Sequence, residues 1–196
     1  MKYYCVGIKG AGMGTLANIL KDLGNEVSGY DDDTHYKYTE DGLKKRNIKI
    51  YYDGSASLDK DTIVTYSKAF KPEHKEMKRL KELGLKFKEY NEVVGDLTKQ
   101  FETISVCGTH GKTTTTLLIS ELLESVGCNY FVGDGSGYAD KDNSLFVIES
   151  DEYNKHLLAY HPYLAVLTSI ELDHTECYEG GIEEIKETFK TFCNKA

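Results

Sequence analysis

The sequence predicts an α/β fold in which a Rossmann-like, parallel-sheet N-terminal domain is followed by the first part of a second α/β domain with a phosphate-binding loop. Three observations predict it. Short apolar runs alternate with helical patterns along most of the chain, which is typical of parallel sheets. A glycine-rich loop stands at a strand-to-helix junction twice, at residues 7–14 and 108–111. A polar stretch at 98–102 separates the two patterns, so the expected domains are 1–98 and 99–196.

The elements of the first domain follow from apolar spacing and from glycine and proline signals. An apolar run at 3–8 predicts the first strand, and Gly24 ends a helix that begins near Gly12. The apolar face of that helix consists of Met13, Leu16, Ala17, Leu20 and Leu23. Pro72 suits the first turn of a later helix, and Gly84 suits its end. The remaining elements are strands at 26–30, 48–52, 61–66 and 85–90 and short helices at 39–46 and 93–97.

The second domain begins with the apolar positions of a short strand at 104–107, directly before the second glycine loop. A helix follows from Lys112, and Gly127 ends it. The residues that recur there at helical spacing are Leu117, Leu118, Leu122, Leu123 and Val126. Further strands are expected at 130–132, 145–149 and 164–169, and a last helix at 182–193.

Composition limits the classes of function. With 24 basic against 32 acidic residues the net charge is -8, which argues against a broad surface for nucleic acid or an anionic membrane. The five cysteines include no CxxC pair, which favours a reducing compartment over disulfides or a zinc site. No apolar run is long enough to cross a bilayer, and the N-terminus lacks a signal-peptide core. We therefore expect a soluble, cytoplasmic protein.

The second glycine loop is the most informative motif. It reads Gly108, Thr109, His110, Gly111, Lys112, Thr113 and Thr114. Backbone N–H groups of such a loop and the following helix N-terminus bind phosphates, Lys112 can neutralise the terminal phosphates, and Thr113 can offer a hydroxyl to magnesium. The general pattern GxxxxGK[ST] asks for glycine where this chain has Val106, so the match is a variant. The alternative is a glycine-rich turn that only caps a helix.

The first glycine loop, from Gly7 to Gly14, has the spacing GxxGxG rather than the GxGxxG of dinucleotide folds. Three aspartates from Asp31 to Asp33 close the next strand, about where an acidic residue would meet a ribose hydroxyl in that fold. From these residues alone a nicotinamide cofactor is one interpretation. The other is that the glycines allow close packing and the aspartates form a solvated turn.

Polar residues also follow two later strands. Glu149 ends an apolar run after the phosphate loop, where such proteins hold the magnesium of a nucleotide, and Asp151 and Glu152 are the next candidates. His174 follows another strand beside acidic residues and is a candidate metal ligand or phosphate contact. The histidines with weaker claims are His110, His156 and His161. A solvated loop is the alternative for the carboxylates, and a structural role for the histidine.

Taken together, the loop from Gly7 to Gly14, the run GTHGKT and the pair Asp173-His174 resemble the Mur ligases, the ATP-dependent amino-acid ligases of peptidoglycan precursor synthesis. The resemblance covers essentially the whole chain. It implies a UDP-sugar rather than a nicotinamide cofactor in the first domain. The residues implied for UDP-N-acetylmuramate are Gly7, Gly10, Ala11, Gly12 and Met13 around the diphosphate, Asp31 near the uridine and Ser67 near the substrate's path.

For the second domain the resemblance implies ATP on the loop from Gly108 to Thr114 and Mg2+ on Thr113, Glu149 and His174. Lys112, Glu149 and His174 are the implied catalytic residues. The implied reaction transfers the terminal phosphoryl group of ATP to the lactyl carboxylate of UDP-N-acetylmuramate, and the amine of L-alanine then displaces phosphate from the acyl phosphate. Lys112, magnesium and the loop amides would stabilise the developing charge.

The chain departs from the family pattern in two places. Ser169 stands where the family usually has asparagine, and Thr175-Glu176 replaces a segment whose second residue is aspartate, so that Glu176 could keep the carboxylate. The chain also ends soon after Thr116 compared with the family, which continues into a C-terminal domain that binds the amino acid. We therefore expect an N-terminal fragment that is inactive alone. A non-catalytic binder of UDP-muramyl precursors and an NAD-dependent oxidoreductase remain the alternatives.

Overall fold

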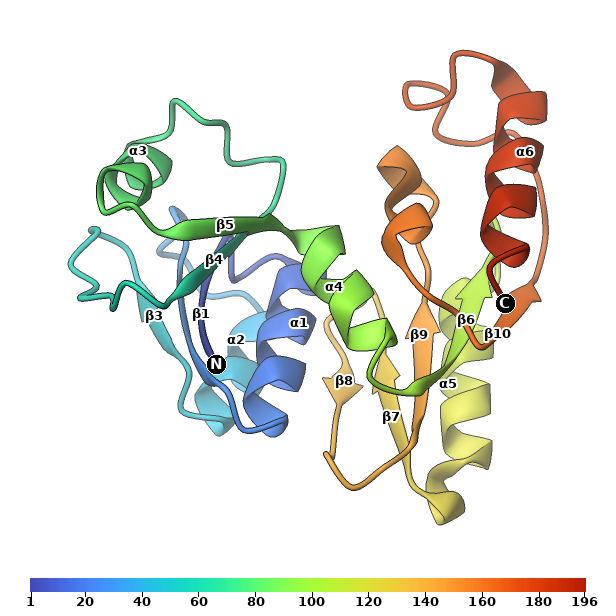
Figure 1. The fold of residues 1–196 in the computed structure, drawn as a ribbon, viewed down its shortest axis with the longest axis horizontal. Coiled ribbons are helices and arrows are strands. Elements are labelled where there is room, and N and C mark those ends of the chain that lie inside the picture. Colours follow the sequence, from blue (N-terminus) through green and yellow to red (C-terminus); the bar gives the residue numbers. More distant parts are fainter. The chain divides into compact units, whose positions relative to one another are not determined.

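The computed structural model describes residues 1–196 and confirms the predicted α/β class, with two sheets built mainly of parallel strands (Figure 1). The chain divides into two compact units. Met1–Val93 and Gly133–Ala139 form the first unit, and Val94–Val132 and Asp140–Ala196 form the second. The expected boundary after Thr98 stays a prediction. None of the helices has both the length and the apolar character needed to cross a membrane.

The first unit contains a sheet with the strand order β3-β2-β1-β4-β5, and all neighbouring strands are parallel. The strands are β1 (Lys2–Val6), β2 (Glu26–Tyr30), β3 (Lys49–Tyr51), β4 (Ile63–Tyr66) and β5 (Lys86–Glu89). Along the chain, β2 and β3 are added on one side of β1, and β4 and β5 are then added on the other side. In such sheets ligands bind outside the carboxyl ends of the strands, at the point where the winding reverses.

Helices pack on this sheet and complete its core. They are α1 (Ala11–Asp22), α2 (Thr39–Lys45), α3 (Lys75–Glu82) and the start of α4 (Tyr90–Thr98). The predicted face of α1 is largely buried, since Met13, Leu16, Ala17 and Leu20 are each at most 4% exposed. A cluster with α3 contains Tyr4, Val6, Tyr30, Val64, Met77 and Leu80. Expected and observed boundaries in this unit differ by a few residues, mainly at strand ends and at the start of α3.

A loop from the later part of the chain, Gly133–Ala139, belongs to the first unit. Its short strand β8 (Gly137–Tyr138) was not expected from the sequence. Tyr38 donates a hydrogen bond from its hydroxyl to the carbonyl of Asp134 at 2.8 Å. Arg46 forms a bidentate pair with Asp22, at 2.7 and 2.8 Å, and also donates to the carbonyl of Gly137 at 3.3 Å. The loop is therefore held by side chains of the first unit.

The second unit contains four parallel strands that lie side by side in the order β10, β6, β9, β7. They are β6 (Glu102–Cys107), β7 (Cys128–Phe131), β9 (Leu145–Glu149) and β10 (Leu164–Leu167). The helices are α5 (Lys112–Leu122), α6 (Gly181–Cys193) and the 3-10 segments η1 (Glu124–Val126) and η2 (Tyr153–Ala159). Neither 3-10 segment was expected. Because the strands are parallel, the loops after β6, β9 and β10 meet at one edge of the sheet.

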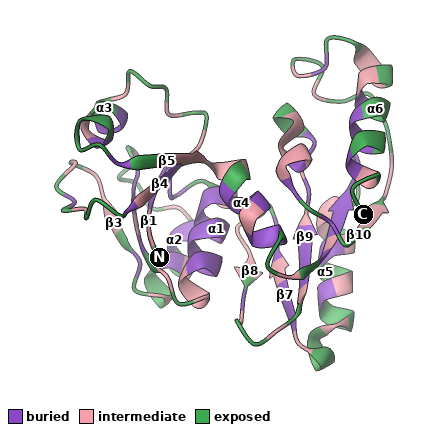
Figure 2. Ribbon diagram, viewed as in Figure 1, coloured by how far each residue is buried: buried purple, intermediate pink, exposed green.

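The orientation of α5 differs from what its apolar spacing suggests. Leu118 and Leu122 are 60% and 78% exposed, whereas Thr116 and Ser120 are buried. Much of α5 is exposed or only partly buried (Figure 2). The expected helix end at Gly127 is also too late, since α5 ends at Leu122 and η1 follows. The face turned toward the sheet also carries Ile119 and Leu123, which pack against the core of Val106, Cys128 and Val147, and the hydroxyl of Thr113 on the same face donates to Glu149 on β9.

Candidate functional site

The phosphate loop connects β6 to α5 through two glycines in left-handed conformations, with φ of 128° at Gly108 and 82° at Gly111. The position of the expected first glycine, Val106, lies within β6 and is fully buried in the core with Cys128 and Val147. A glycine there would remove packing, and the loop starts only at Gly108. The chain thus has valine rather than glycine at position 106 because β6 continues through this position to Cys107.

The loop is fastened to the segment after β10. The backbone N–H groups of Thr109 and His110 donate to the carbonyl and to the hydroxyl of Ser169, both at 3.0 Å. Thr168 donates from its hydroxyl to the carbonyl of His110 at 2.6 Å. Ser169, one of the departures from the family pattern, therefore supplies an acceptor oxygen to the loop. Sequence reasoning did not identify Thr168 and Ser169 as loop supports, because their partners are about sixty residues away in the sequence.

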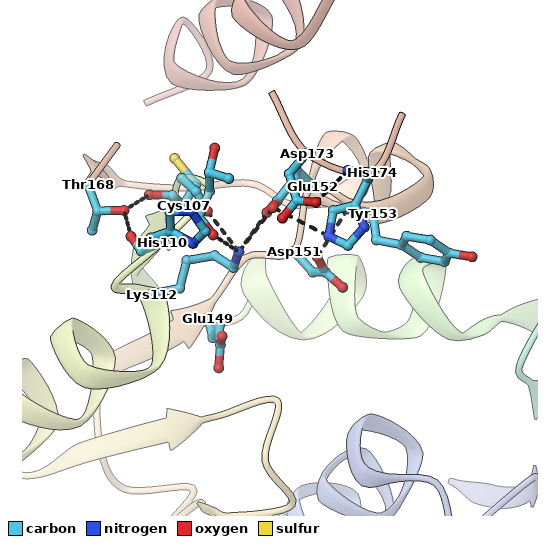
Figure 3. Close-up of polar contacts among 12 residues, drawn as sticks. Cys107, His110, Lys112, Glu149, Asp151, Glu152, Tyr153, Thr168, Asp173 and His174 are labelled. Carbon is cyan, nitrogen blue, oxygen red and sulfur yellow. Dashed lines mark hydrogen bonds and ion pairs between the residues drawn. The ribbon is translucent and has the colours of Figure 1, made fainter. Parts of the chain in front are cut away.

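Lys112 lies at the centre of the site and contacts both its own loop and Glu152 (Figure 3). Its ammonium nitrogen is 2.8 Å from the carbonyl oxygen of Gly108 and 3.2 Å from that of Thr109. It also lies 2.8 and 3.1 Å from the two carboxylate oxygens of Glu152. The Glu152 side chain is only 3% exposed and that of Lys112 12%. This is a buried ion pair between the loop lysine and a carboxylate that follows β9.

The candidate metal ligands fall into two groups. Thr113 donates from its hydroxyl to a carboxylate oxygen of Glu149 at 2.9 Å. His174 lies elsewhere, with Asp151 and Glu152, and the potential ligand atoms of these three residues are all within 4.8 Å of one another. Figure 3 shows Glu149 pointing away from this second group. The structure thus brings the expected Thr113 and Glu149 together and places the expected His174 with two carboxylates that were secondary candidates.

His174 is held in an unusual conformation. Its φ is 51°, a left-handed value that is uncommon for residues other than glycine. Its Nε2 lies 3.8 Å from Glu152 and its Nδ1 3.7 Å from Glu176, while its ring packs against Tyr153 with centroids 5.3 Å apart. Glu176, the second departure from the family pattern, therefore keeps a carboxylate beside the histidine.

The weaker histidine candidates lie outside this arrangement. His110 has a largely exposed side chain, 3.5 Å from Glu171. His156 also packs against Tyr153, with ring centroids 6.2 Å apart. His161 donates its backbone N–H to Thr98, and burial together with nearby lysines lowers the pKa of its ring.

The first glycine loop follows β1 at the carboxyl edge of the first sheet. Gly7, with φ of 82°, and Ile8 both donate backbone N–H groups to the carbonyl of Tyr30. A side chain at Gly7 would meet the ring of Phe70 at 2.8 Å, and one at Gly12 would meet the hydroxyl of Tyr90 at 2.8 Å. Gly7 and Gly12 therefore have no room for a side chain.

Asp31 and Ser67 end the strands on either side of β1 and so lie at the same edge as the glycine loop. Asp31 is 6% exposed, and its carboxylate accepts backbone N–H groups of Lys9 at 2.9 Å and of Asp33 at 3.1 Å. The hydroxyl of Ser67 accepts from the backbone of Ala69 at 3.3 Å. Asp31 therefore holds the glycine loop in place through the hydrogen bond from Lys9.

A buried ion pair that sequence reasoning missed also holds the first glycine loop in place. The ammonium group of Lys9 is 2.8 Å from Glu40, and it donates to the carbonyls of Asp33 and His35. Lys9 is 1% exposed and Glu40 6%. A lysine between the glycines was the only sequence signal, because its partner lies on α2. The hydrogen bond from Lys9, with help from Lys44, holds the pKa of Glu40 at about 2 despite burial.

We expect this pair to make stability depend on pH. A carboxyl whose pKa falls from 4.5 to about 2 on folding adds stability above the higher value and loses it toward the lower. Glu40→Gln should therefore destabilise the first unit at pH 7, and the difference from the unaltered chain should shrink as the pH falls from 4.5 toward 2. Urea unfolding at pH 7, 4 and 3 measures this. The exposed Glu82→Gln is the control, and a difference that stays constant with pH would contradict the assignment.

Comparison with known proteins gives the family. The family "Mur ligase family, catalytic domain" matches residues 2–102, about half of the chain, and the chain belongs to the Mur ligase family. It is similar to the UDP-N-acetylmuramate–L-alanine ligases of Lacticaseibacillus casei and Lactiplantibacillus plantarum, with 42% and 39% identity over 194 residues. In both cases the alignment covers 98% of this chain and 44% of the relative. The chain thus spans less than half the length of these curated relatives.

Solved structures agree in fold. The UDP-N-acetylmuramate:L-alanyl-gamma-D-glutamyl-meso-diaminopimelate ligase of Neisseria meningitides is similar with a TM-score of 0.82 and 26% identity, covering 100% of this chain and 68% of that one. The UDP-N-acetylmuramate–alanine ligase of Thermotoga maritima gives a TM-score of 0.83 at 22% identity, covering 100% and 47%. The second similarity concerns the fold alone.

Proposed function

We propose that this chain forms the UDP-sugar-binding and ATP-binding part of a cytoplasmic ligase that joins L-alanine to UDP-N-acetylmuramate in peptidoglycan precursor synthesis. The observation that carries the proposal is the 42% identity to such a ligase across 98% of the chain. The phosphate loop supports it, because Lys112 and Thr113 begin α5 directly after the loop and the hydroxyl of Thr113 lies 2.9 Å from Glu149 at the end of β9. In this proposal residues 1–98 bind the UDP-sugar and residues 99–196 bind ATP.

In the first unit, backbone N–H groups of the loop containing Gly7, Gly10, Ala11, Gly12 and Met13 would bind the diphosphate. This loop opens α1, which has no acidic residue in its first turn, so the positive end of the helix dipole is not neutralised. Ser67 lies at the same strand edge. Asp31 would act mainly by fixing the loop, since both of its carboxylate oxygens accept backbone hydrogen bonds.

In the second unit, the loop from Gly108 to Thr114 would bind the phosphates of ATP. Lys112 would neutralise charge on the transferred phosphoryl group, and the first-turn amides of α5 would orient it. The attacking group in the proposed first step is the lactyl carboxylate of the sugar, which gives an acyl phosphate and ADP. The amine of L-alanine then displaces inorganic phosphate and forms the amide. Positioning and electrostatics supply most of the catalysis in such transfers.

The residues present fit magnesium. Thr113 and Glu149 offer a hydroxyl and a carboxylate 2.9 Å apart beside the loop, and oxygen ligands of this kind suit a hard cation. Asp151, Glu152 and His174 form a second group of oxygen and nitrogen donors. Bound there, magnesium would supply positive charge to the phosphate oxygens. We propose the first pair for the nucleotide's cation and the second group for a further one.

Binding measurements on this chain test the proposal. Calorimetry should show that ATP with MgCl2 binds and that UDP-N-acetylmuramate binds independently. Gly10→Ala should weaken only the UDP-sugar, because its added side chain would lie 3.3 Å from the carbonyl of Gly7 in the first loop. Binding of NADH, read by its fluorescence, in place of the UDP-sugar would support a dehydrogenase instead. Failure of the UDP-sugar to bind would contradict the first half of the proposal.

A further inference from the structure

The ammonium group of Lys112 has no donor left for a phosphate in this structure. It carries three N–H groups and contacts four acceptor oxygens, two carbonyls of its own loop and both carboxylate oxygens of Glu152. The loop carbonyls are fixed by the fold. A phosphate that reaches Lys112 where it lies in this structure must take the place of at least one of these acceptors, and the carboxylate of Glu152 is the only one of them on a side chain.

Glu152 is anchored at its backbone, whereas its carboxylate is hydrogen-bonded to the side chain of Lys112. The hydroxyl of Tyr178 donates to the carbonyl of Glu152 at 2.7 Å, and the backbone N–H of Lys155 donates to the same carbonyl at 2.8 Å. Asn154 and Lys155 follow with left-handed φ of 49° and 56°, which fixes the turn after it. These contacts hold the backbone in place, so a change of partner at the carboxylate requires only the side chain to turn.

A second partner for the carboxylate is already adjacent. The same oxygen that is 3.1 Å from Lys112 is 3.8 Å from Nε2 of His174, and Asp151 completes the group of potential cation ligands. A carboxylate 3% exposed and released from its lysine would be buried without a partner, which is strongly unfavourable. A cation held with His174 and Asp151 would remove that penalty, and Figure 3 shows these side chains beside Glu152.

We infer that Glu152 is a positioning residue that alternates between two partners. It pairs with Lys112 when no nucleotide is bound. When a phosphate binds Lys112, Glu152 turns to a divalent cation held with Asp151 and His174. This rests on the proposed function, since it assumes that Lys112 binds ATP. The consequence is a coupling between sites. The cation strengthens ATP binding beyond its effect on the nucleotide itself, and ATP strengthens cation binding by the same factor.

Calorimetry with ATP in excess EDTA and in MgCl2 tests the exchange. Glu152→Gln should bind magnesium-free ATP about tenfold more tightly than the unaltered chain and should lose a similar factor of its magnesium dependence. Glu171→Gln is the matched control, because it removes the same charge beside the loop but lies near His110 rather than Lys112. Its effect should stay below about twofold, as for other exposed charges.

His174→Ala provides a second test that leaves the ion pair intact. It should keep the magnesium-free affinity and lose about tenfold of the gain from magnesium. An unchanged magnesium-free affinity in Glu152→Gln, with a melting temperature that shows a folded protein, would overturn the exchange, as would a full magnesium gain in His174→Ala. If the unaltered chain bound no ATP even with magnesium, the proposed function would fail and the exchange with it. ATP binding with identical magnesium dependence in all variants would overturn the exchange alone.

Discussion

Replacing Lys112 with methionine is expected to lower the free energy of unfolding of the second unit by about 3–5 kcal/mol, because Glu152 is left as a buried, unpaired charge. The ion pair is 2.8 Å long, and the carboxylate side chain is 3% exposed, so water cannot replace the lysine. ATP binding should be lost in the same variant. Urea unfolding followed by circular dichroism measures the first effect, and calorimetry the second.

Two controls separate the charge from the lost packing. Adding Glu152→Gln to Lys112→Met should restore most of the stability, because the double variant buries no charge. Lys155→Met removes another lysine–glutamate pair of the same unit, to Glu184, whose side chains are 39% and 31% exposed. Its effect should remain below about 1 kcal/mol, as for other exposed pairs. Equal losses for Lys112→Met and Lys155→Met would contradict the importance of burial.

Gly108→Ala is expected to destabilise the second unit by about 2–5 kcal/mol, from a strained backbone and from overpacking together. The residue has φ of 128°, and an added Cβ would lie 2.2 Å from the hydroxyl of Thr168 and 2.9 Å from backbone atoms of Ser169. The phosphate loop would have to separate from the segment after β10. We therefore expect ATP binding to be lost, with urea unfolding giving the stability change.

Gly111→Ala is the matched variant, since it lies three residues further in the same loop. It also has a positive φ, of 82°, but its Cβ would have only Thr168 nearby, at 3.9 Å. The expected cost is the backbone contribution alone, about 1–2 kcal/mol. If the two variants lost equal stability, the contact between Gly108 and the segment after β10 would not be what requires the glycine.

What could be predicted from the sequence is local in character. The two glycine loops, Lys112 and Thr113 belong to motifs whose chemistry depends on neighbours within one turn, so their spacing predicts the fold class and the strand-to-helix junctions. Strand ends were less accurate. Ser169, for example, was placed in a strand, although β10 ends at Leu167 and Ser169 instead holds the phosphate loop.

What could not be predicted depends on residues far apart in the sequence. The partner of Lys112 is forty residues away and that of Lys9 about thirty, and no period or composition links them. The rotation of α5 is similar. Leu117, Leu118 and Leu122 suggest one face and are exposed, whereas Ile119 and Leu123 pack on the core beside the polar Thr116 and Ser120, so the leucine spacing alone does not identify the buried face. The division of the metal candidates into two groups has the same origin, because it depends on which strand ends are adjacent.

The loop Gly133–Ala139 has a consequence for how this protein can be divided. Since it belongs to the first unit although it lies between strands of the second, the backbone passes from one unit to the other three times. If the chain were cleaved between Val93 and Val94, the hydrogen bonds from Tyr38 and Arg46 to this loop would still join the two pieces. For the same reason, one crossover between two related genes cannot replace the whole first unit. The coding sequences for residues 1–93 and 133–139 would have to be exchanged together.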